Sequence, residues 1–219
     1  MSYYSSKIVT PPSTEPVTLD EAKAHLRIEV AADDSLITDM IKAARELVEK
    51  ETNLALITQT WGLYMDSWGT QNQSYAGYIE TEHWSGLSGY SATPYKQKGI
   101  ELPKSPIISI DSIKIYADDN SFTTFDSANY YLSNEFPAQV YLKNNVSPPA
   151  GTRVKDSIVI QYQAGYGNAG AVPFSLKIAI KQIVAGWYEN REAFVVGTIS
   201  EELPLSVKRI LSKFRTLRI

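Results

Sequence analysis

The stretch that decides the fold is residues 16–53, PVTLDEAKAHLRIEVAADDSLITDMIKAARELVEKETN. Thr18 and Glu21 have the T-x-x-E spacing of a capping box, in which each side chain bonds the other residue's free backbone N–H. A second helix is expected after Asp33, because acidic residues suit the positive end of a helix dipole. Asn53 is a plausible end, since it tolerates the left-handed conformation. The apolar stripe of this longer helix comprises Leu36, Ile37, Met40, Ile41, Ala44, Leu47 and Val48, at helical intervals.

Further along the chain, the hydrophobic period changes from helical to alternating. Trp61, Leu63 and Met65 alternate with Thr60, Gly62 and Tyr64, as expected of a half-buried strand. A hairpin turn is predicted at 118–120, because Asp and Asn favour turns. Isoleucines before and after Asp111-Ser112 alternate with opposite parity, which indicates a bulge or a change of face there. The other expected strands are residues 108–115, 122–125, 130–132, 140–142 and 158–162.

Helical spacing returns after Pro173, a good first residue for a helix. A last short helix is expected after Pro204. Helices at both ends and strands between them predict an α+β fold, in which a helical body carries an inserted small antiparallel sandwich or barrel. The expected parts are an N-terminal helical part (1–56), a β domain (57–165) with a long loop (69–98), and a C-terminal helical part (166–219).

The composition excludes several classes of protein. The 219 residues carry a net charge of −3, whereas a protein that coats nucleic acid is usually distinctly basic. There is no cysteine, so disulfides, thiol catalysis and cysteine-bound metals are excluded. The N-terminus has no apolar core of the signal-peptide kind, and no run approaches the ~18 apolar residues of a membrane span. We expect a protein made in the cytoplasm, without a membrane partner.

No motif indicates an enzyme. Residues 165–170 read G-x-G-x-x-G, but Pro173 starts the helix after the last glycine, so a flexible turn is a better interpretation than a dinucleotide site. His25 and His83 have no zinc-ligand spacing. No two carboxylates are paired by sequence as an acid and a base. We therefore expect no catalytic residues, no metal and no cofactor.

Residues 69–98 are polar and rich in aromatic side chains, and loops of this length are usually functional or mobile. Their rings could stack on sugars, pack on their own sheet, or contact a neighbouring subunit or partner, and a disordered tip is the remaining alternative. A subunit or partner contact is the favoured reading. The aromatic residues concerned are Tyr75, Tyr78, Trp84, Tyr90 and Tyr95.

The C-terminal tail is the sharpest electrostatic feature. Residues 204–219 contain five basic side chains and no acid, so the rest of the chain must sum to −8. A basic amphipathic helix at a chain end can dock on an acidic partner or on nucleic-acid phosphates. The alternative is a solvated face above a buried stripe of Val207, Ile210, Leu211 and Phe214. The basic residues are Lys208, Arg209, Lys213, Arg215 and Arg218.

Taken together, these features resemble the head-tail connector (adaptor) family of long-tailed bacteriophages and related prophage elements. The likeness spans nearly the whole chain in the expected order. Residues 69–98 are longer than that pattern needs. The segments that carry it are PVTLDEAKAHLRI (16–28), DDSLITDMIKAARELVE (33–49), LPKSPIISIDSIKIY (102–116), IVIQYQAGYG (158–167), VPFSLKIAIKQIVAGWYENRE (172–192) and LPLSVKRILSKFR (203–215).

The resemblance implies a structural protein and not an enzyme. Such connectors form a ring, commonly of twelve subunits, beneath the portal after DNA packaging. The ring extends the DNA channel and offers a surface to the next tail-completion (stopper) protein. The resemblance thus implies a homo-oligomer at the head-tail junction of a virion, assembled in the host cytoplasm, with DNA passing through without sequence specificity.

The basic C-terminal helix would then dock on the portal, and removing residues 204–219 is expected to leave a folded protein that no longer binds it. Two other classes stay open. The β domain could be a glycan or cell-surface binding module, in which Trp84 contributes to retention on a polysaccharide. An enzyme acting on DNA during packaging would need a metal-carboxylate cluster or phosphate loop, and the sequence offers neither.

Overall fold

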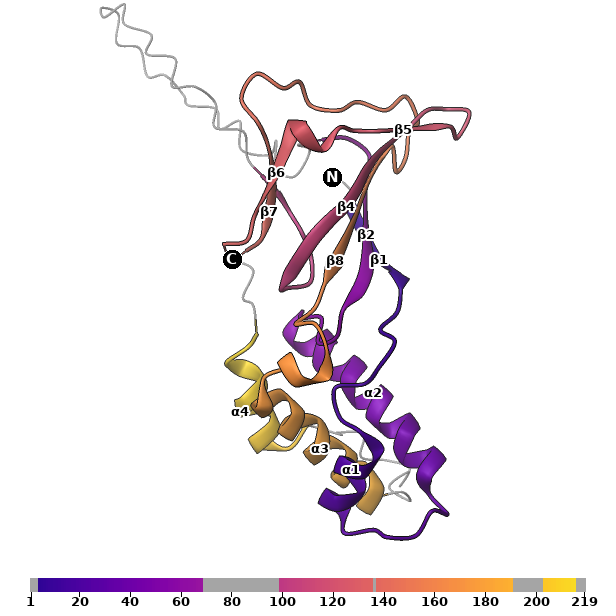
Figure 1. The fold of residues 1–219 in the computed structure, drawn as a ribbon, viewed down its shortest axis with the longest axis vertical. Coiled ribbons are helices and arrows are strands. Elements are labelled where there is room, and N and C mark those ends of the chain that lie inside the picture. Colours follow the sequence, from indigo (N-terminus) through magenta and orange to yellow (C-terminus); the bar gives the residue numbers. More distant parts are fainter. Residues whose placement is uncertain (1–3, 69–98, 136, 191–202, 216–219) are drawn as a thin grey trace, which may run out of the picture. The chain divides into compact units, whose positions relative to one another are not determined.

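The computed structural model describes residues 4–68, 99–135, 137–190 and 203–215. The α+β prediction is confirmed: helices come from both ends of the sequence and antiparallel strands lie between them (Figure 1). The helices are α1 (Leu19–Leu26), α2 (Asp34–Thr52), α3 (Phe174–Glu189) and α4 (Leu205–Ser212). The strands are β1 (Tyr4–Thr10), β2 (Gln59–Met65), β3 (Ile100–Glu101), β4 (Ile107–Tyr116), β5 (Phe122–Thr124), β6 (Tyr130–Ser133), β7 (Gln139–Leu142) and β8 (Ile158–Ala164).

The chain divides into two compact units. The β unit comprises Met1–Lys7, Trp61–Leu102 and Ser109–Tyr162. The helical unit comprises Ile8–Thr60, Pro103–Ile108 and Gln163–Ile219. All four helices therefore belong to one unit, although α2 and α3 are separated in sequence by most of the strands.

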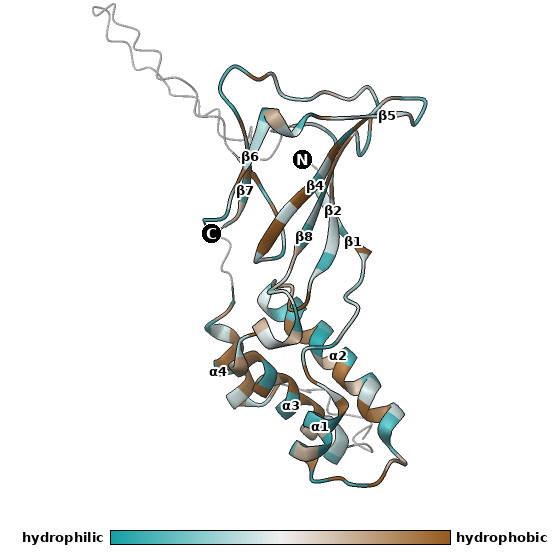
Figure 2. Ribbon diagram, viewed as in Figure 1, coloured by the Kyte–Doolittle hydropathy of each residue, from teal (hydrophilic) through white to brown (hydrophobic). Residues whose placement is uncertain are grey.

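The core of the helical unit forms where the apolar faces of its helices meet. The helices carry both hydrophobic and hydrophilic residues, as amphipathic helices do (Figure 2). Segments from both ends of the sequence contribute to one apolar cluster, so neither end buries its stripe alone. Its members are Val17, Ala22, Ile37, Ile41, Ala44, Val48, Leu54, Leu56, Ile57, Val172, Leu176, Ala179, Ile180, Ile183, Val184, Val207 and Leu211.

The start of α1 has the predicted capping box. The Thr18 hydroxyl accepts from the Glu21 N–H at 3.1 Å, and the Glu21 carboxylate accepts from the Thr18 N–H at 3.0 Å. Val17 before the cap and Ala22 within the helix are both buried in the helical core. The two reciprocal bonds satisfy backbone groups that a helix leaves unpaired at its start.

Replacing Thr18 by alanine should therefore lower the free energy of unfolding by about 1 kcal/mol. The side-chain acceptor for the Glu21 N–H is lost, and the bond from the Thr18 N–H to the Glu21 carboxylate is no longer reinforced by it. Urea denaturation would measure the change. Ser35→Ala, at an exposed position in the first turn of α2, is the control and should change stability by less than about 0.5 kcal/mol. Equal effects of the two variants would show that the box adds nothing.

The strands form two sheets. The five-stranded sheet has the order β1-β2-β8-β4-β5, and the three-stranded sheet has the order β3-β7-β6. The predicted hairpin is confirmed, because β4 and β5 pair antiparallel with Lys114 opposite Thr124. In the smaller sheet, Tyr131 lies opposite Tyr141. Neither sheet closes into a barrel in the described ranges, so the barrel alternative falls away.

The stretch around Asp111 lies within one strand, β4, which buries Ile107 and Ile113 and leaves Ile108 46% exposed, and the bulge or change of face expected there stays a prediction. Strands β1 and β3 were not predicted. Among the described residues, no helix is long and apolar enough to cross a membrane.

Candidate functional site

The predicted docking helix is α4, and its apolar face packs into the protein's own core. Val207 and Leu211 are almost fully buried in the helical unit, and Ile210 and Phe214 are packed against the same cluster. The Ser206 hydroxyl bonds the Gln182 side chain of α3 at 3.2 Å. The buried stripe of α4 is thus already occupied within the subunit, so a partner can reach only its solvent-facing, largely polar side.

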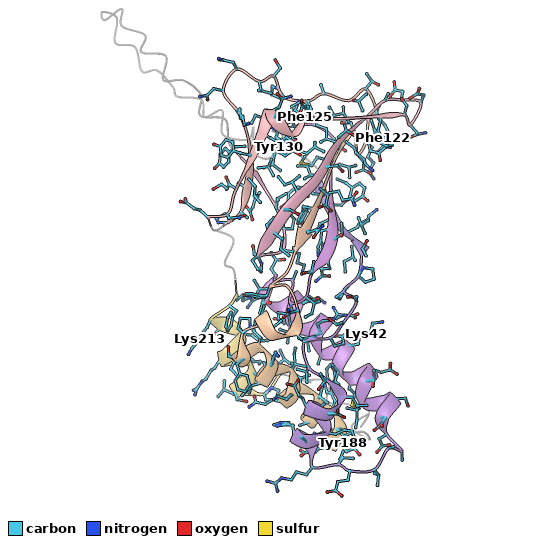
Figure 3. The ribbon with its side chains drawn as sticks, in the orientation of Figure 1. Lys42, Phe122, Phe125, Tyr130, Tyr188 and Lys213 are labelled. Atoms are coloured by element: carbon cyan, nitrogen blue, oxygen red, sulfur yellow. The ribbon has the colours of Figure 1, made fainter. Side chains whose placement is uncertain are left out.

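That polar side is basic. Lys208, Arg209, Lys213 and Arg215 are all exposed, and together they are called the basic face of α4 here. Lys213 lies on the outer side of this helix (Figure 3). Arg218, the fifth predicted residue, lies outside the described residues. Positive side chains in the last turn also suit the negative end of the helix dipole. The face can therefore bind an anionic surface without any change in the packing of α4.

The packing of α4 corrects one expectation. Removal of residues 204–219 would take Val207 and Leu211 out of the core, so a truncated chain should not fold normally. Large-to-small changes at single buried positions already cost about 2–5 kcal/mol. Substitutions on the exposed side of α4 are thus the proper test of docking.

The predicted aromatic contact residues, Tyr75 to Tyr95 and Trp84 among them, lie outside the described residues. The β unit has aromatic clusters elsewhere that the sequence did not single out. The Phe125 and Tyr130 rings stack at 6.2 Å, and Trp68 lies 6.4 Å from Phe125. Phe122, which is half exposed, pairs with Tyr116 at 5.5 Å (Figure 3). These rings are largely engaged with one another, as in a packed aromatic cluster.

A buried polar network on α2 is the main feature that sequence reasoning missed. Arg45 is 3% exposed and Glu49 is 5% exposed. The Arg45 guanidinium donates to the Glu49 carboxylate at 2.8 Å and to the Glu15 carboxylate at 2.7 Å. It also lies 3.4 Å from the Glu46 carboxylate. Arg45 therefore fixes the segment before α1 to the side of α2.

The same glutamate holds the segment that follows α2. Its carboxylate accepts from the Leu56 N–H at 2.8 Å and from the Gln59 side-chain amide at 2.9 Å. Lys104 donates its ammonium to the Glu49 backbone carbonyl at 2.8 Å. The end of α2, residues 56–59 and Lys104 thus meet around Glu49. We call Arg45, Glu49, Gln59 and Lys104 the α2 anchor.

Two charged groups of the anchor, Glu49 and Arg45, have shifted pKa values. Burial raises the pKa of the Glu49 carboxyl above its usual range, against the opposing effects of the Leu56 N–H and the Arg45 charge. Burial also works against the charge of Arg45, but the hydrogen bond to Glu15 and the charge of Glu49 raise its pKa overall. As an acceptor, the Glu49 carboxylate faces three donors, the Arg45 guanidinium, the Leu56 N–H and the Gln59 side-chain amide. The buried side-chain oxygen of Gln59 has no hydrogen-bond partner among the described residues.

The glycine motif forms a clasp next to this anchor and not a cofactor loop. Gly165 has φ +137°, and its N–H donates to the Pro106 carbonyl at 2.8 Å. The Gly167 carbonyl accepts from the Thr58 N–H at 3.0 Å. The α3 helix begins only at Phe174, so its N-terminus is not built into the motif as a dinucleotide site requires. The interpretation as a turn is thereby supported.

Neither histidine enters a metal site that the structure describes. His25 is exposed on α1, and His83 lies outside the described residues. No group of three His, Cys, Asp or Glu side chains in the described ranges could hold a metal ion. The fold and its surfaces thus define an α+β protein whose candidate sites are contact surfaces.

Comparison with known families identifies the family to which the chain belongs. The sequence model of the phage gp6-like head-tail connector proteins matches residues 16–143 and 137–215, which is most of the chain. The chain therefore belongs to the family of phage gp6-like head-tail connector proteins, and a structural connector role follows from that membership. None of the curated proteins searched matches it.

Solved structures with a similar fold come from gene transfer agent (GTA) particles. A chain in the neck of an empty GTA particle, determined with C6 symmetry, has a TM-score of 0.72 at 20% identity, covering 98% of this chain and 97% of that one. A chain in the virion of a native gene transfer agent has a TM-score of 0.73 at 19% identity, covering 98% and 96%. A chain in the neck of a native GTA particle, determined with C12 symmetry, has a TM-score of 0.67 at 19% identity, covering 98% of this chain and 97% of that one.

Proposed function

We propose that this protein forms a ring beneath the portal of a phage or phage-like particle after DNA packaging, where it extends the DNA channel and carries the tail-attachment surface. The observation that carries the proposal is the family match over residues 16–143 and 137–215. The similar chains in GTA necks determined with C6 and C12 symmetry support a ring, with twelve subunits as the expected number. The role is structural, and no catalytic step is assigned to it.

The proposed partners follow from the same position. They are the portal ring above, the tail-completion protein below, neighbouring copies of the chain, and the DNA that passes through without sequence-specific contacts. The site is the head-tail junction of the virion, and assembly takes place in the host cytoplasm without a membrane. The net charge of −3 limits non-specific attraction between the ring as a whole and the DNA.

The basic face of α4 is the proposed portal-binding surface. Its four described charges are exposed on α4 and just after its end, and the helix is already packed, so docking requires no folding step. Identical weak contacts repeated around a ring add up to stable attachment, because each bound subunit raises the local concentration of the next contact. The aromatic residues of 69–98 are proposed to contact a neighbouring subunit or the tail-completion protein.

Imaging tests the function directly. The chain is mixed with the purified portal ring encoded in the same genome and examined by electron microscopy. A second ring stacked on the portal supports the proposal. Two folded components that do not associate at high concentration would reject it, and retention on a polysaccharide matrix would then favour the ligand-binding module.

Reversing the basic face of α4 should weaken portal binding by at least about tenfold, because four favourable charge contacts per subunit become repulsive. The variant carries Lys208→Glu, Arg209→Glu, Lys213→Glu and Arg215→Glu. Its control is Lys42→Glu with Lys50→Glu, two exposed positions on α2. Surface plasmon resonance on immobilised portal, at low and at high salt, measures the affinities of the variant and of the control for the portal. If the variant binds as tightly as the control, α4 is not the docking surface.

A further inference from the structure

The helices of the helical unit expose large apolar side chains in two places. In the described part of the chain outside its strands, four such side chains of this unit are exposed: Val30 at 64%, Leu36 at 37%, Phe174 at 69% and Leu205 at 64%. Val30 and Leu36 belong to the turn between α1 and α2 and the start of α2. Phe174 and Leu205 begin the adjoining helices α3 and α4.

The first pair is surrounded by acidic residues. Residues 27–40 contain four acids and one base, Arg27, which gives this stretch a net charge of −3. Two of the acids already have partners, since Asp34 pairs with Lys23 and Asp33 accepts from Tyr188. The other two remain exposed beside the apolar side chains. We call Glu29, Val30, Leu36 and Asp39 the acidic patch.

The second pair is surrounded by basic residues. Lys177 lies one turn after Phe174 on α3, and the Lys181 ammonium lies 5.5 Å from the centre of the Phe174 ring. Leu205 is joined to this helix through its neighbour Ser206, whose hydroxyl bonds Gln182. The one acid of α3, Glu189, lies at its far end. We call Phe174, Lys177, Lys181 and Leu205 the basic patch.

The two patches are separate surfaces of one unit. Tyr188 near the end of α3 donates to Asp33 at 2.7 Å, which places that end of α3 beside the turn that carries Val30. Phe174 begins the same helix fourteen residues earlier, which corresponds to about 21 Å along the helix axis. The turn between α1 and α2 lies at one end of the helices, and α3 leads away from it (Figure 1).

We infer that the acidic patch of one copy of this chain binds the basic patch of the next copy in the ring. This inference rests on the proposed ring. Each patch combines exposed apolar side chains with charged side chains, and the charges of the two patches have opposite signs, which suits a protein-protein interface. A ring of identical subunits needs two different, complementary patches on each subunit, because head-to-tail contacts generate rings. The two lysines of the basic patch lie on α3, whereas the charges of the basic face lie on α4 and just after it, so the two proposed contacts use different charged side chains.

Charge reversal provides the first test. Lys177→Glu with Lys181→Glu should weaken ring formation on the portal by at least about tenfold in the protein concentration required, and Glu29→Lys with Asp39→Lys should do the same. The variant with all four changes has the charges exchanged between the patches and should recover. Electron microscopy counts the portals that carry a complete second ring. Failure of the four-fold variant to recover, with each variant folded by circular dichroism, would overturn the inference.

Site-specific cross-linking provides a second test that does not depend on charge. Because the chain has no cysteine, Val30→Cys and Phe174→Cys each introduce a single thiol. With a short bifunctional maleimide, a mixture of the two variants on the portal should give dimers that contain one chain of each. The doubly substituted chain should give a ladder of higher oligomers. Dimers from either variant alone, at equal yield, would show a two-fold contact and overturn the inference.

The two tests separate this interface from the function itself. If the wild-type chain forms a complete ring but the Val30→Cys and Phe174→Cys variants do not cross-link to each other, the proposed interface is wrong and the connector role stands. Wild-type chains that form no ring on a folded portal would overturn both. Lys42→Glu with Lys50→Glu, on the exposed side of α2, is the charge control and should leave ring formation unchanged.

Discussion

Replacing Arg45 by alanine is expected to lower the free energy of unfolding by about 3–5 kcal/mol, the usual cost of breaking a buried ion pair on one side. Glu49 would keep its place in the core at 5% exposure but lose the Arg45 guanidinium, a cationic donor at 2.8 Å. The Glu15 carboxylate would lose the 2.7 Å bond that fixes the segment before α1. The loss therefore falls on two segments at once, and urea denaturation should show a lower midpoint.

Lys42→Ala is the matched control, because Lys42 lies on the exposed side of the same helix, about one turn before Arg45 (Figure 3). This change should alter stability by no more than about 0.5 kcal/mol. Arg45→Lys should be intermediate, since an ammonium keeps the charge but cannot form the forked pair of bonds. If the alanine variants at the two positions were equally stable, the α2 anchor would contribute nothing to the fold.

Gly165→Ala should be the second strongly destabilising change, costing about 2–4 kcal/mol from backbone strain and steric overlap together. The residue has φ +137°, where L side chains are strained. A Cβ would also lie 2.5 Å from the Ile57 carbonyl oxygen, which is backbone and cannot rotate away. Relief would require breaking the 2.8 Å bond from the Gly165 N–H to Pro106.

Gly186→Ala is a control that should change the stability in the opposite direction. Gly186 lies inside α3, and a Cβ there would meet nothing within 4 Å. Alanine should therefore raise stability by about 0.5–1 kcal/mol through its better helix propensity. Thermal unfolding followed by circular dichroism distinguishes the two glycines. A Gly165 variant as stable as the wild type would show that the clasp relaxes without cost.

The helices could be predicted because each carries local signals. The capping box at Thr18, the left-handed end at Asn53 and the prolines before α3 and α4 are all properties of a few adjacent residues. Strand β2 was recognised from alternation, since one face of it is buried. These signals need no knowledge of the rest of the fold, which is why a single sequence contains them.

The missed strands lack such signals. All seven residues of β1 are exposed, so no alternation between buried and exposed positions marks it. Strand β3 has two residues and exists only because β7 pairs with it. Pairing with a distant partner creates these edge strands, and a local pattern cannot reveal that partner.

The buried network was missed for a related reason. Arg45 and Glu49 are spaced as an ordinary surface ion pair on a helix, four residues apart. Arg45 nevertheless lies between Ile41, Ala44 and Val48 on the apolar stripe, and that position was the available signal. Leu36 shows the converse, because it follows the helical spacing but remains 37% exposed. Spacing indicates which residues share a face, whereas burial depends on what covers it.

The α2 anchor and the glycine clasp have a mechanical consequence. The chain passes between the two units at five points, and four of these lie within a few residues of Gln59, Lys104, Pro106 or Gly165. A pull exerted on the β unit would be divided among these passages. Bonds loaded side by side must rupture together, whereas bonds loaded in series open one after another. The bonds of the α2 anchor and of the glycine clasp would thus carry part of such a force before it reaches the contacts between the helices.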